Sequence, residues 1–267
     1  MSLTTPLSVQ KLQTALHDKA KGSPKFRFYA LYDKVYREDV LAFAYECCKA
    51  NGGAAGVDGQ TFEDIEEYGV QKWLDELTQE LRSRTYQPQP VRRVWIPKPD
   101  GKQRPLGIPT IRDRVVQTAA VLVLEPIFEA DLAAEQYAYR ADRSALDAVQ
   151  HVHKLINTGH GQIVDADLSS YFDSVPHAEL LKSVARRIVD GAMLHLIKDV
   201  ARSSRRRNRG TGQQTSEYAQ SGRRSRDTTR VSDQSFAQQS VHATVRAGVE
   251  ETRARGALES VHRELCR

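Results

Sequence analysis

Apolar residues recur at helical spacing in several stretches of the chain up to Lys198, and this pattern disappears beyond it. The first clear stretch follows Thr61, where Glu63 and Asp64 mark a helix start and apolar side chains then recur every three or four residues to about position 84. We therefore predict a helix that packs one face on a core. Its apolar positions are Ile65, Val70, Trp73, Leu74, Leu77 and Leu81.

Two short extended runs follow, VRRVWIP and RPLGIP, on either side of KPDGKQ. Because Pro-Asp-Gly is a turn signal between extended runs, we predict a β-hairpin over residues 91–109 with a basic tip. The pattern also predicts helices over residues 112–129, 144–157, 177–188 and 191–198, and a short strand beginning at Ile163. The 144–157 helix gathers Ala148, Val149, Val152, Leu155 and Ile156 on one face. These elements predict an α/β (α+β) fold.

Length and composition allow a globular enzyme. The chain has 267 residues, 40% of them hydrophobic, which suffices for one sizeable core or two small domains. No apolar run is long enough to span a membrane and the N-terminus lacks a signal-peptide pattern, so we expect a cytoplasmic protein with no membrane partner. The cysteines at 47, 48 and 266 form neither a disulfide framework nor a spaced zinc motif.

The distribution of charged residues differs strongly between the two parts of the chain, which the net charge of +5 does not show. Up to Lys198 there are 25 Lys and Arg against 26 Asp and Glu, whereas beyond it there are 14 Arg, 8 acids and no Lys. The segment ARSSRRRNRGTGQQTSEYAQSGRRSRDTTRVSDQS has almost no apolar residue to bury. We therefore expect residues 202–240 to be disordered, because this composition cannot offset the entropy of ordering.

The predicted strand ends at an acidic residue, within the sequence IVDADLSSYFDSVPH. Polymerase-type phosphoryl transfer needs two divalent metal ions, about 3.5–4 Å apart, held by carboxylates. Asp167 at the strand end fits one side of such a site, the carbonyl of Leu168 could add an oxygen ligand, and Phe172 is placed to lie under the sugar of a nucleotide. A plainer interpretation stays open, in which Asp165, Asp167 and Asp173 are strand-end and turn acids and Phe172 belongs to the core.

The predicted hairpin favours the first interpretation. Lys98 and Arg104 flank its Asp-Gly turn, and a basic hairpin folded over a triphosphate would neutralise charge during phosphoryl transfer. A solvated turn would look the same in isolation, so the argument rests on the combination of the two motifs.

With these motifs the chain resembles the reverse transcriptases encoded by bacterial group II introns. The resemblance begins at GVDGQTFEDI, continues through WIPKPDGKQRPLGIPTIRDRVVQTA and LEPIFEADLAAEQYAYRADRSALDAV, and reaches VDADLSSYFDSVPH and the helix ending at Lys198. It implies that Lys98 and Arg104 contact the nucleotide triphosphate, that Asp167 is the first catalytic aspartate and a Mg²⁺ ligand together with the Leu168 carbonyl, and that Phe172 is the sugar gate. The implied partners are an intron RNA template, a DNA primer and deoxynucleotide triphosphates.

Two departures from that family accompany the resemblance. Where the family reads Gly-Phe-Arg-Pro-Gly-Arg-Ser, this chain has AYRADRS, which keeps Arg140, Arg143 and Ser144 but leaves the shape of the loop open. Beyond Lys198 the chain lacks the family's Pro-Gln-Gly loop and the Tyr-Ala-Asp-Asp turn that carries the remaining metal ligands. We therefore expect no measurable polymerase activity from the chain as it stands.

A shift of reading frame near Lys198 accounts for the second departure. Residues 226–234 can be written in codons that spell Gly-Thr-Pro-Gln-Gly-Ser-Pro-Ile one base later, and residues 264–267 with a stop codon likewise give Asn-Tyr-Ala-Asp. Residues 198–202 become Lys-Met-Trp-Leu in the same frame. Three ordered matches in one shifted frame indicate a disrupted gene or a sequencing error in one.

This interpretation divides the chain into four parts and predicts a partial right-hand polymerase. Residues 1–55 form a helical N-terminal segment, 56–160 the fingers region, 161–198 the start of the palm, and 199–267 an out-of-frame, arginine-rich tail. The expected function is RNA-directed DNA synthesis with intron mobility and splicing assistance. Two alternatives stay open: a non-catalytic fragment that grips intron RNA through phosphates, and a metal-dependent phosphohydrolase that uses Asp165 and Asp167.

Overall fold

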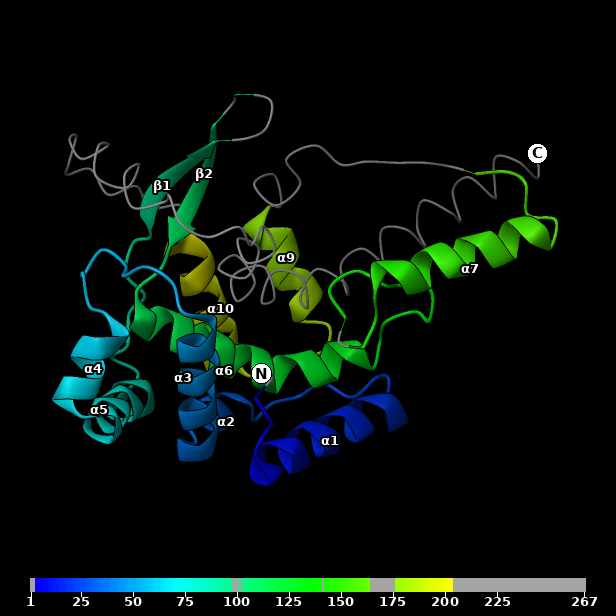
Figure 1. Ribbon diagram of the computed structural model, residues 1–267. Coiled ribbons are helices and arrows are strands. Elements are labelled where there is room, and N and C mark those ends of the chain that lie inside the picture. The colour runs from blue at the N-terminus through cyan, green and yellow to red at the C-terminus, as the bar shows by residue number, and fades with distance from the viewer. Residues whose placement is uncertain (1–2, 98–100, 102, 141, 164–175, 204–267) are drawn as a thin grey trace.

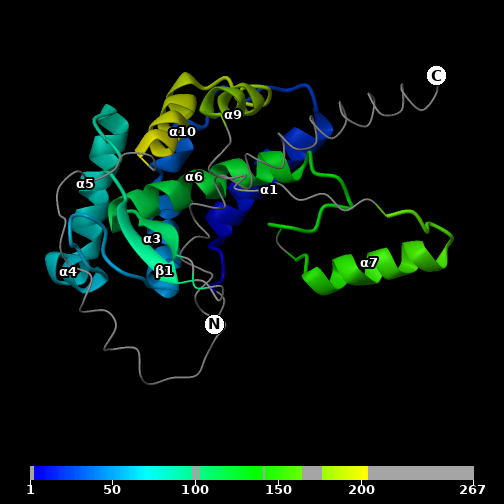
Figure 2. The same cartoon turned by 90° about the horizontal axis from the view of Figure 1, so that it is seen from above.

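The computed structural model describes residues 3–97, 101, 103–140, 142–163 and 176–203. Its centre is one long helix, α6 (Ile111–Glu129), whose sequence is apolar around most of its circumference. Val115, Ala119 and Ile127 on it are fully buried. Helices α1 (Leu7–Gly22) and α3 (Glu38–Asn51) pack along α6, as Figures 1 and 2 show from two directions. A helix that is hydrophobic all round is thus enclosed by its neighbours, as expected.

The helix predicted after Thr61 is two helices, α4 (Phe62–Tyr68) and α5 (Val70–Ser83). Thr61 caps the first, because its hydroxyl accepts from the Asp64 N–H while the Asp64 carboxylate accepts from the Thr61 N–H. The prediction of a single helix is wrong because Gly69 adopts a φ of 103°, which interrupts helical geometry. The expected apolar face is confirmed on α5: Trp73, Leu74, Leu77 and Leu81 are buried.

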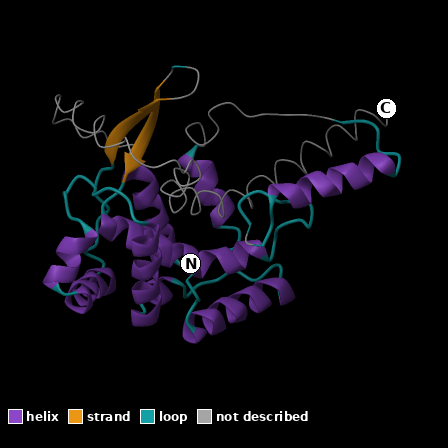
Figure 3. Cartoon of the chain, in the orientation of Figure 1, coloured by secondary structure: helices purple, strands orange, loops and turns teal. Residues whose placement is uncertain are grey.

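The predicted hairpin is confirmed as two antiparallel strands, β1 (Arg92–Pro97) and β2 (Gln103–Ile108). They are the strands of the described part of the chain, and they stand away from the helices (Figure 3). Two strands alone are marginally stable in water, so the hairpin depends on the body beneath it. Val91 and Ile108 anchor its base, since both are buried.

Helices α9 (His177–Val184) and α10 (Gly191–Ser203) differ from their predicted lengths. α9 ends early because Ile188 leaves helical geometry to form an isolated parallel bridge with Phe28. α10 continues beyond Lys198 to Ser203, because Val200 and Ala201 extend its buried apolar stripe. The predicted disorder is therefore wrong for residues 202–203, and the remainder of that prediction lies outside the described residues.

Helix α7 (Ala145–Asn157) has Ser144 as its N-cap, one residue from the predicted start, but within the part of the chain that the structure describes it buries no residue. It extends away from α6 in both views (Figures 1 and 2). Its large apolar side chains are exposed there: Leu146, Val149, Val152, Leu155 and Ile156. Among the described helices, none is long and apolar enough to cross a membrane.

Candidate nucleic-acid interface at the hairpin

The hairpin presents cationic and aromatic side chains on exposed strands. On β1, Arg93 and Trp95 are exposed, and the Trp95 side chain keeps 53% of its surface accessible. In the strand register Trp95 lies opposite Pro105, and Ile96 lies opposite Arg104 near the turn of the hairpin. Arg93 and Trp95 are two positions apart on β1, so their side chains point to the same face of the hairpin, and an arginine with an aromatic ring suits phosphates and unstacked bases.

The predicted site residues are placed only in part. The main chain of Arg104 lies in β2, as predicted for a hairpin residue, but its side chain is outside the described part of the structure. Lys98, Asp167, Leu168 and Phe172 lie outside the described residues, so their proposed roles remain predictions. The same holds for the two further acids of the strand motif, at positions 165 and 173.

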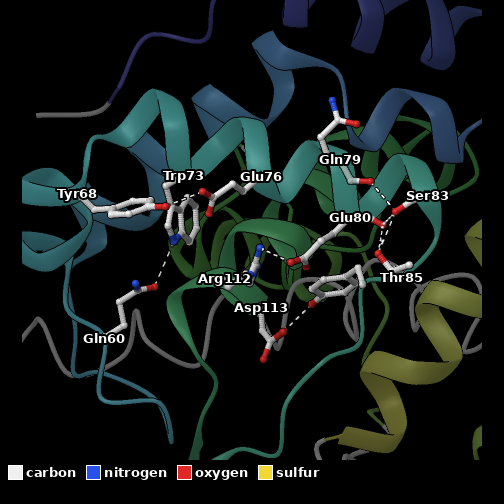
Figure 4. A network of polar contacts seen from close by, with 11 residues as sticks. Gln60, Tyr68, Trp73, Glu76, Gln79, Glu80, Ser83, Thr85, Arg112 and Asp113 are labelled. Carbon is white, nitrogen blue, oxygen red and sulfur yellow. Dashed lines mark hydrogen bonds and ion pairs between the residues drawn. The ribbon is translucent and has the colours of Figure 1, made fainter.

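The segment entering the hairpin is fixed by a buried carboxylate at the start of α6. The Asp113 carboxylate accepts from the Tyr86 hydroxyl at 2.6 Å and from the Gln89 N–H at 3.1 Å, while the Asp113 N–H donates to the hydroxyl of the helix cap Thr110 at 3.1 Å. Burial raises the pKa of Asp113, although these hydrogen bonds oppose the rise, and burial also raises the pKa of Tyr86. Figure 4 shows Asp113 beside the contact between Arg112 and Glu80 of α5.

A second buried ionic group lies on the following part of α6. Arg114 is 8% exposed and donates to the carbonyls of Gly52 and Ala54 at 3.1 and 2.5 Å. Its guanidinium also lies 5.8 Å from the centre of the Phe62 ring. Burial lowers the pKa of Arg114 from its usual value, and the charge is retained because an arginine side chain stays protonated in proteins.

Sequence reasoning missed Asp113 and Arg114, for different reasons. The spacing of Thr110 and Asp113 is that of a helix cap, a local signal that could have marked Asp113. No local signal marks Arg114, because the carbonyls it binds lie about 60 positions earlier in the chain.

Of the two arginines in the AYRADRS loop, one makes its polar contacts with neighbouring residues of the protein. Arg140 makes contacts of 2.9 and 2.5 Å with the Glu129 carboxylate and also donates to the Ala133 and Gln136 carbonyls. Through these contacts Arg140 stabilises the conformation of the loop. Asp142, which stands where the related family has Gly, adopts a left-handed φ of 56°. The loop of this chain therefore has a left-handed residue at that position.

The other arginine of the loop borders an open cavity beside α7. Arg143 lies 5.4 Å from the centre of the Tyr137 ring, and the Tyr137 hydroxyl is 2.8 Å from His151 Nδ1. Asp147 is engaged with Ser144 at the start of α7, and these hydrogen bonds lower its pKa. The cavity has a volume of about 410 Å³ and mixes Asp, Arg, Lys and His side chains.

The described residues contain no group of three or more His, Cys, Asp or Glu side chains that could hold a metal ion. Asp167 and Leu168, which are predicted to bind Mg²⁺, lie outside that part of the chain, so Mg²⁺ binding by them stays a prediction. The two described cysteines, Cys47 and Cys48, are free thiols, and Cys48 is buried in the core.

Residues 96–223 match the family described as reverse transcriptase (RNA-dependent DNA polymerase). The match includes the second half of the hairpin region and extends past Lys198.

Several of the similar proteins have names that refer to introns. Protein YkfC of Escherichia coli K12 is 39% identical over 71% of this chain and 51% of its own length. Group II intron-encoded protein LtrA of Lactococcus lactis subsp. cremoris is 33% identical over 64% of this chain and 28% of its own length. The putative COX1/OXI3 intron 1 protein of Saccharomyces cerevisiae is 28% identical over 65% of this chain and 20% of its own length. The chain spans about half or less of the length of these relatives.

Proposed function

We propose that the first part of this chain is the N-terminal portion of a group II intron-encoded reverse transcriptase or maturase, a protein that carries out RNA-directed DNA synthesis on an intron RNA template, and that the chain as it stands is inactive as a polymerase. The observation that carries the proposal is the exposed basic and aromatic hairpin within a chain related to intron-encoded proteins. The DNA primer and the deoxynucleotide triphosphates are proposed as the other substrates.

The proposed roles follow the position of each residue relative to the hairpin and the strand motif. In the sequence Lys98 directly follows β1 and Arg104 belongs to β2, so the two residues flank the turn of the hairpin and suit contacts with a triphosphate. Asp167 with the Leu168 carbonyl would hold Mg²⁺, and Phe172 would lie under the nucleotide sugar. A divalent metal bound there supplies activation of the primer hydroxyl and stabilisation of the leaving pyrophosphate.

The described residues contribute positioning and RNA contact. Asp113 and its partners fix the segment that enters the hairpin, so the hairpin projects from a rigid base. From that base Trp95 offers a stacking surface and Arg93 a phosphate contact. Neither residue discriminates between bases, which suits an enzyme that copies any template sequence.

RNA binding by the purified chain tests this proposal. Trp95→Ala should weaken single-stranded RNA binding by about 1–3 kcal/mol, the usual worth of one stacked base. Arg93→Ala should lower the salt slope of binding by about one. Fluorescence anisotropy over a salt series measures both, with Arg82→Ala on α5 as the matched control away from the hairpin. RNA affinity that is unchanged in both hairpin variants would contradict the proposal.

The non-catalytic RNA-binding fragment remains the second candidate. It is favoured by the absence of a Tyr-Ala-Asp-Asp sequence anywhere in the chain, since Asp167 would need partner acids to hold two metals. Primer extension with template RNA and Mg²⁺ separates the candidates: incorporation that is lost in Asp167→Ala identifies an enzyme, whereas salt-dependent RNA binding without incorporation identifies the fragment.

A further inference from the structure

The segment between α3 and α4, residues 52–60, is a glycine-rich connector with the sequence GGAAGVDGQ. It holds four glycines and two alanines, and three of its glycines have positive φ angles. Such a chain loses much conformational freedom when it is ordered. A single path for the connector therefore requires strong ties to its surroundings.

Arg114 supplies the strongest of these ties. Its two terminal nitrogens donate to two connector carbonyls, Gly52 and Ala54, and the guanidinium is nearly enclosed. Its Nε has no hydrogen-bond partner, so its polar contacts among the described residues go to this connector. Besides burial, which lowers the pKa of Arg114, the negative charge of Asp58 raises this pKa and the positive charge of Arg92 at the start of β1 lowers it.

A steric contact fixes the middle of the connector. A Cβ added at Gly56 would lie 2.5 Å from Thr110 Cα and 3.0 Å from the Pro109 carbonyl carbon. Pro109 and Thr110 join β2 to α6, so the connector lies directly against the base of the hairpin. Gln60 closes the segment by accepting a hydrogen bond from the Trp73 indole at 3.2 Å.

We propose that Arg114 is a positioning residue, which fixes the glycine-rich connector against the hairpin base so that its exposed main chain extends the RNA-binding surface of the hairpin. The proposal rests on the proposed function. Gly53 and Gly59 are exposed, and residues without bulky side chains allow a polynucleotide backbone to approach closely. Arg114 itself acts through the connector, because its guanidinium is buried against carbonyls.

The chemistry of arginine distinguishes this role from a simple need for positive charge. A guanidinium is a planar fork that donates to two acceptors at once, whereas a lysine ammonium is a point charge on a flexible stem. Arg114→Lys should therefore keep the charge and lose the clamp. Arg114→Gln removes both the fork and the charge.

The clamp is measured directly by ¹⁵N relaxation of the full chain labelled at glycine. In the wild type the order parameters of Gly53 and Gly56 should be near the rigid value of about 0.85, and in Arg114→Gln and Arg114→Lys they should fall below about 0.6. Arg112→Gln is the matched control, because Arg112 lies two positions away on α6 and forms a half-buried pair with Glu80, away from the connector. Unchanged order parameters in both Arg114 variants would overturn the proposal.

The link to RNA is measured as affinity for single-stranded RNA. Both Arg114 variants should bind about three- to tenfold more weakly than wild type, and Arg112→Gln should bind equally well. Gly56→Ala should give the same loss with Arg114 intact, which keeps the test available should an Arg114 variant fail to fold. Mobile glycines with unchanged RNA affinity would refute the extension of the surface. Absence of RNA binding by the wild type would refute the proposed function, while the relaxation data would still decide whether Arg114 orders the connector.

Discussion

At the scale of single residues, Asp190 joins three parts of the chain through its carboxylate. It accepts from the N–H groups of Leu31 and Tyr32 at 2.7 and 2.8 Å, and from those of Ala192 and Met193 at the start of α10. Burial opposes its ionisation, but these four donors outweigh burial and hold its pKa below the usual value of 3.8. The ionised carboxylate is therefore the form that the fold stabilises.

Asp190→Asn should destabilise the chain by about 1–3 kcal/mol near neutral pH, because an amide oxygen replaces a charged acceptor. Since the folded-state pKa is depressed, the advantage of wild type is present above the unfolded pKa and is lost as pH falls through the folded value. Urea denaturation at pH 7 and at pH 3 measures this difference. Asp199→Asn on α10, where the carboxylate pairs with exposed His195, is the control and should change stability by less than about 0.5 kcal/mol. An equal effect of the two substitutions would contradict the prediction.

Asp142 makes a second residue-scale prediction, because its left-handed φ of 56° disfavours side chains that carry a Cβ. Asp142→Gly should raise the free energy of unfolding by about 0.5–1 kcal/mol. Asp142→Ala separates the backbone effect from the loss of the carboxylate, and it should not stabilise. Thermal denaturation of the three proteins measures the difference, and equal stabilisation by Ala and Gly would assign the effect to charge.

At the scale of elements, the exposed apolar face of α7 contrasts with the buried face of α5. Val152 on α7 is 51% exposed, whereas Leu77 on α5 is fully buried. Val152→Ser should change the stability of this chain by less than about 0.5 kcal/mol, and Leu77→Ala should cost about 2–5 kcal/mol. Chemical denaturation of both variants tests the contrast. A large cost at Val152 would show that the face is covered in solution.

At the scale of the whole molecule, the composition change near Lys198 is proposed to be a shift of reading frame. The nucleotide sequence of the gene tests it: the bases after the Lys198 codon should encode Pro-Gln-Gly and then Tyr-Ala-Asp-Asp one base out of frame. A gene in which neither motif occurs in that frame would end the proposal. Where the motifs are found, joining the frames should restore incorporation that depends on Asp167, since the partner carboxylates would then be present.

The continuation of α10 to Ser203 bears on that proposal. An out-of-frame sequence can continue a helix when apolar side chains fall by chance on the inner face of that helix. Val200 and Ala201 lie on the buried face of α10 in this way. The end of the described helix therefore does not have to coincide with the change in composition. The family match to residue 223 likewise ends beyond Lys198.

The sequence by itself determined the features that depend on neighbouring residues. The hairpin follows from Pro-Asp-Gly between two extended runs, and the starts of α4 and α7 follow from Thr61 and Ser144, because caps and turns are made by side chains a few positions apart. The family resemblance is carried by such short motifs as well, and the match to reverse transcriptases confirms it.

Tertiary structure decided the features that depend on distant residues. Helix α9 is shorter than its apolar pattern predicts, and Ile188 instead pairs with Phe28, a residue far away in the sequence. The apolar pattern of α7 predicts a buried face, yet burial requires a partner, and the described part of the chain places none against it. In the sequence nothing distinguishes Arg114 from other helix arginines. Its role depends on the carbonyls of Gly52 and Ala54, which only the folded structure places within hydrogen-bond distance of the guanidinium.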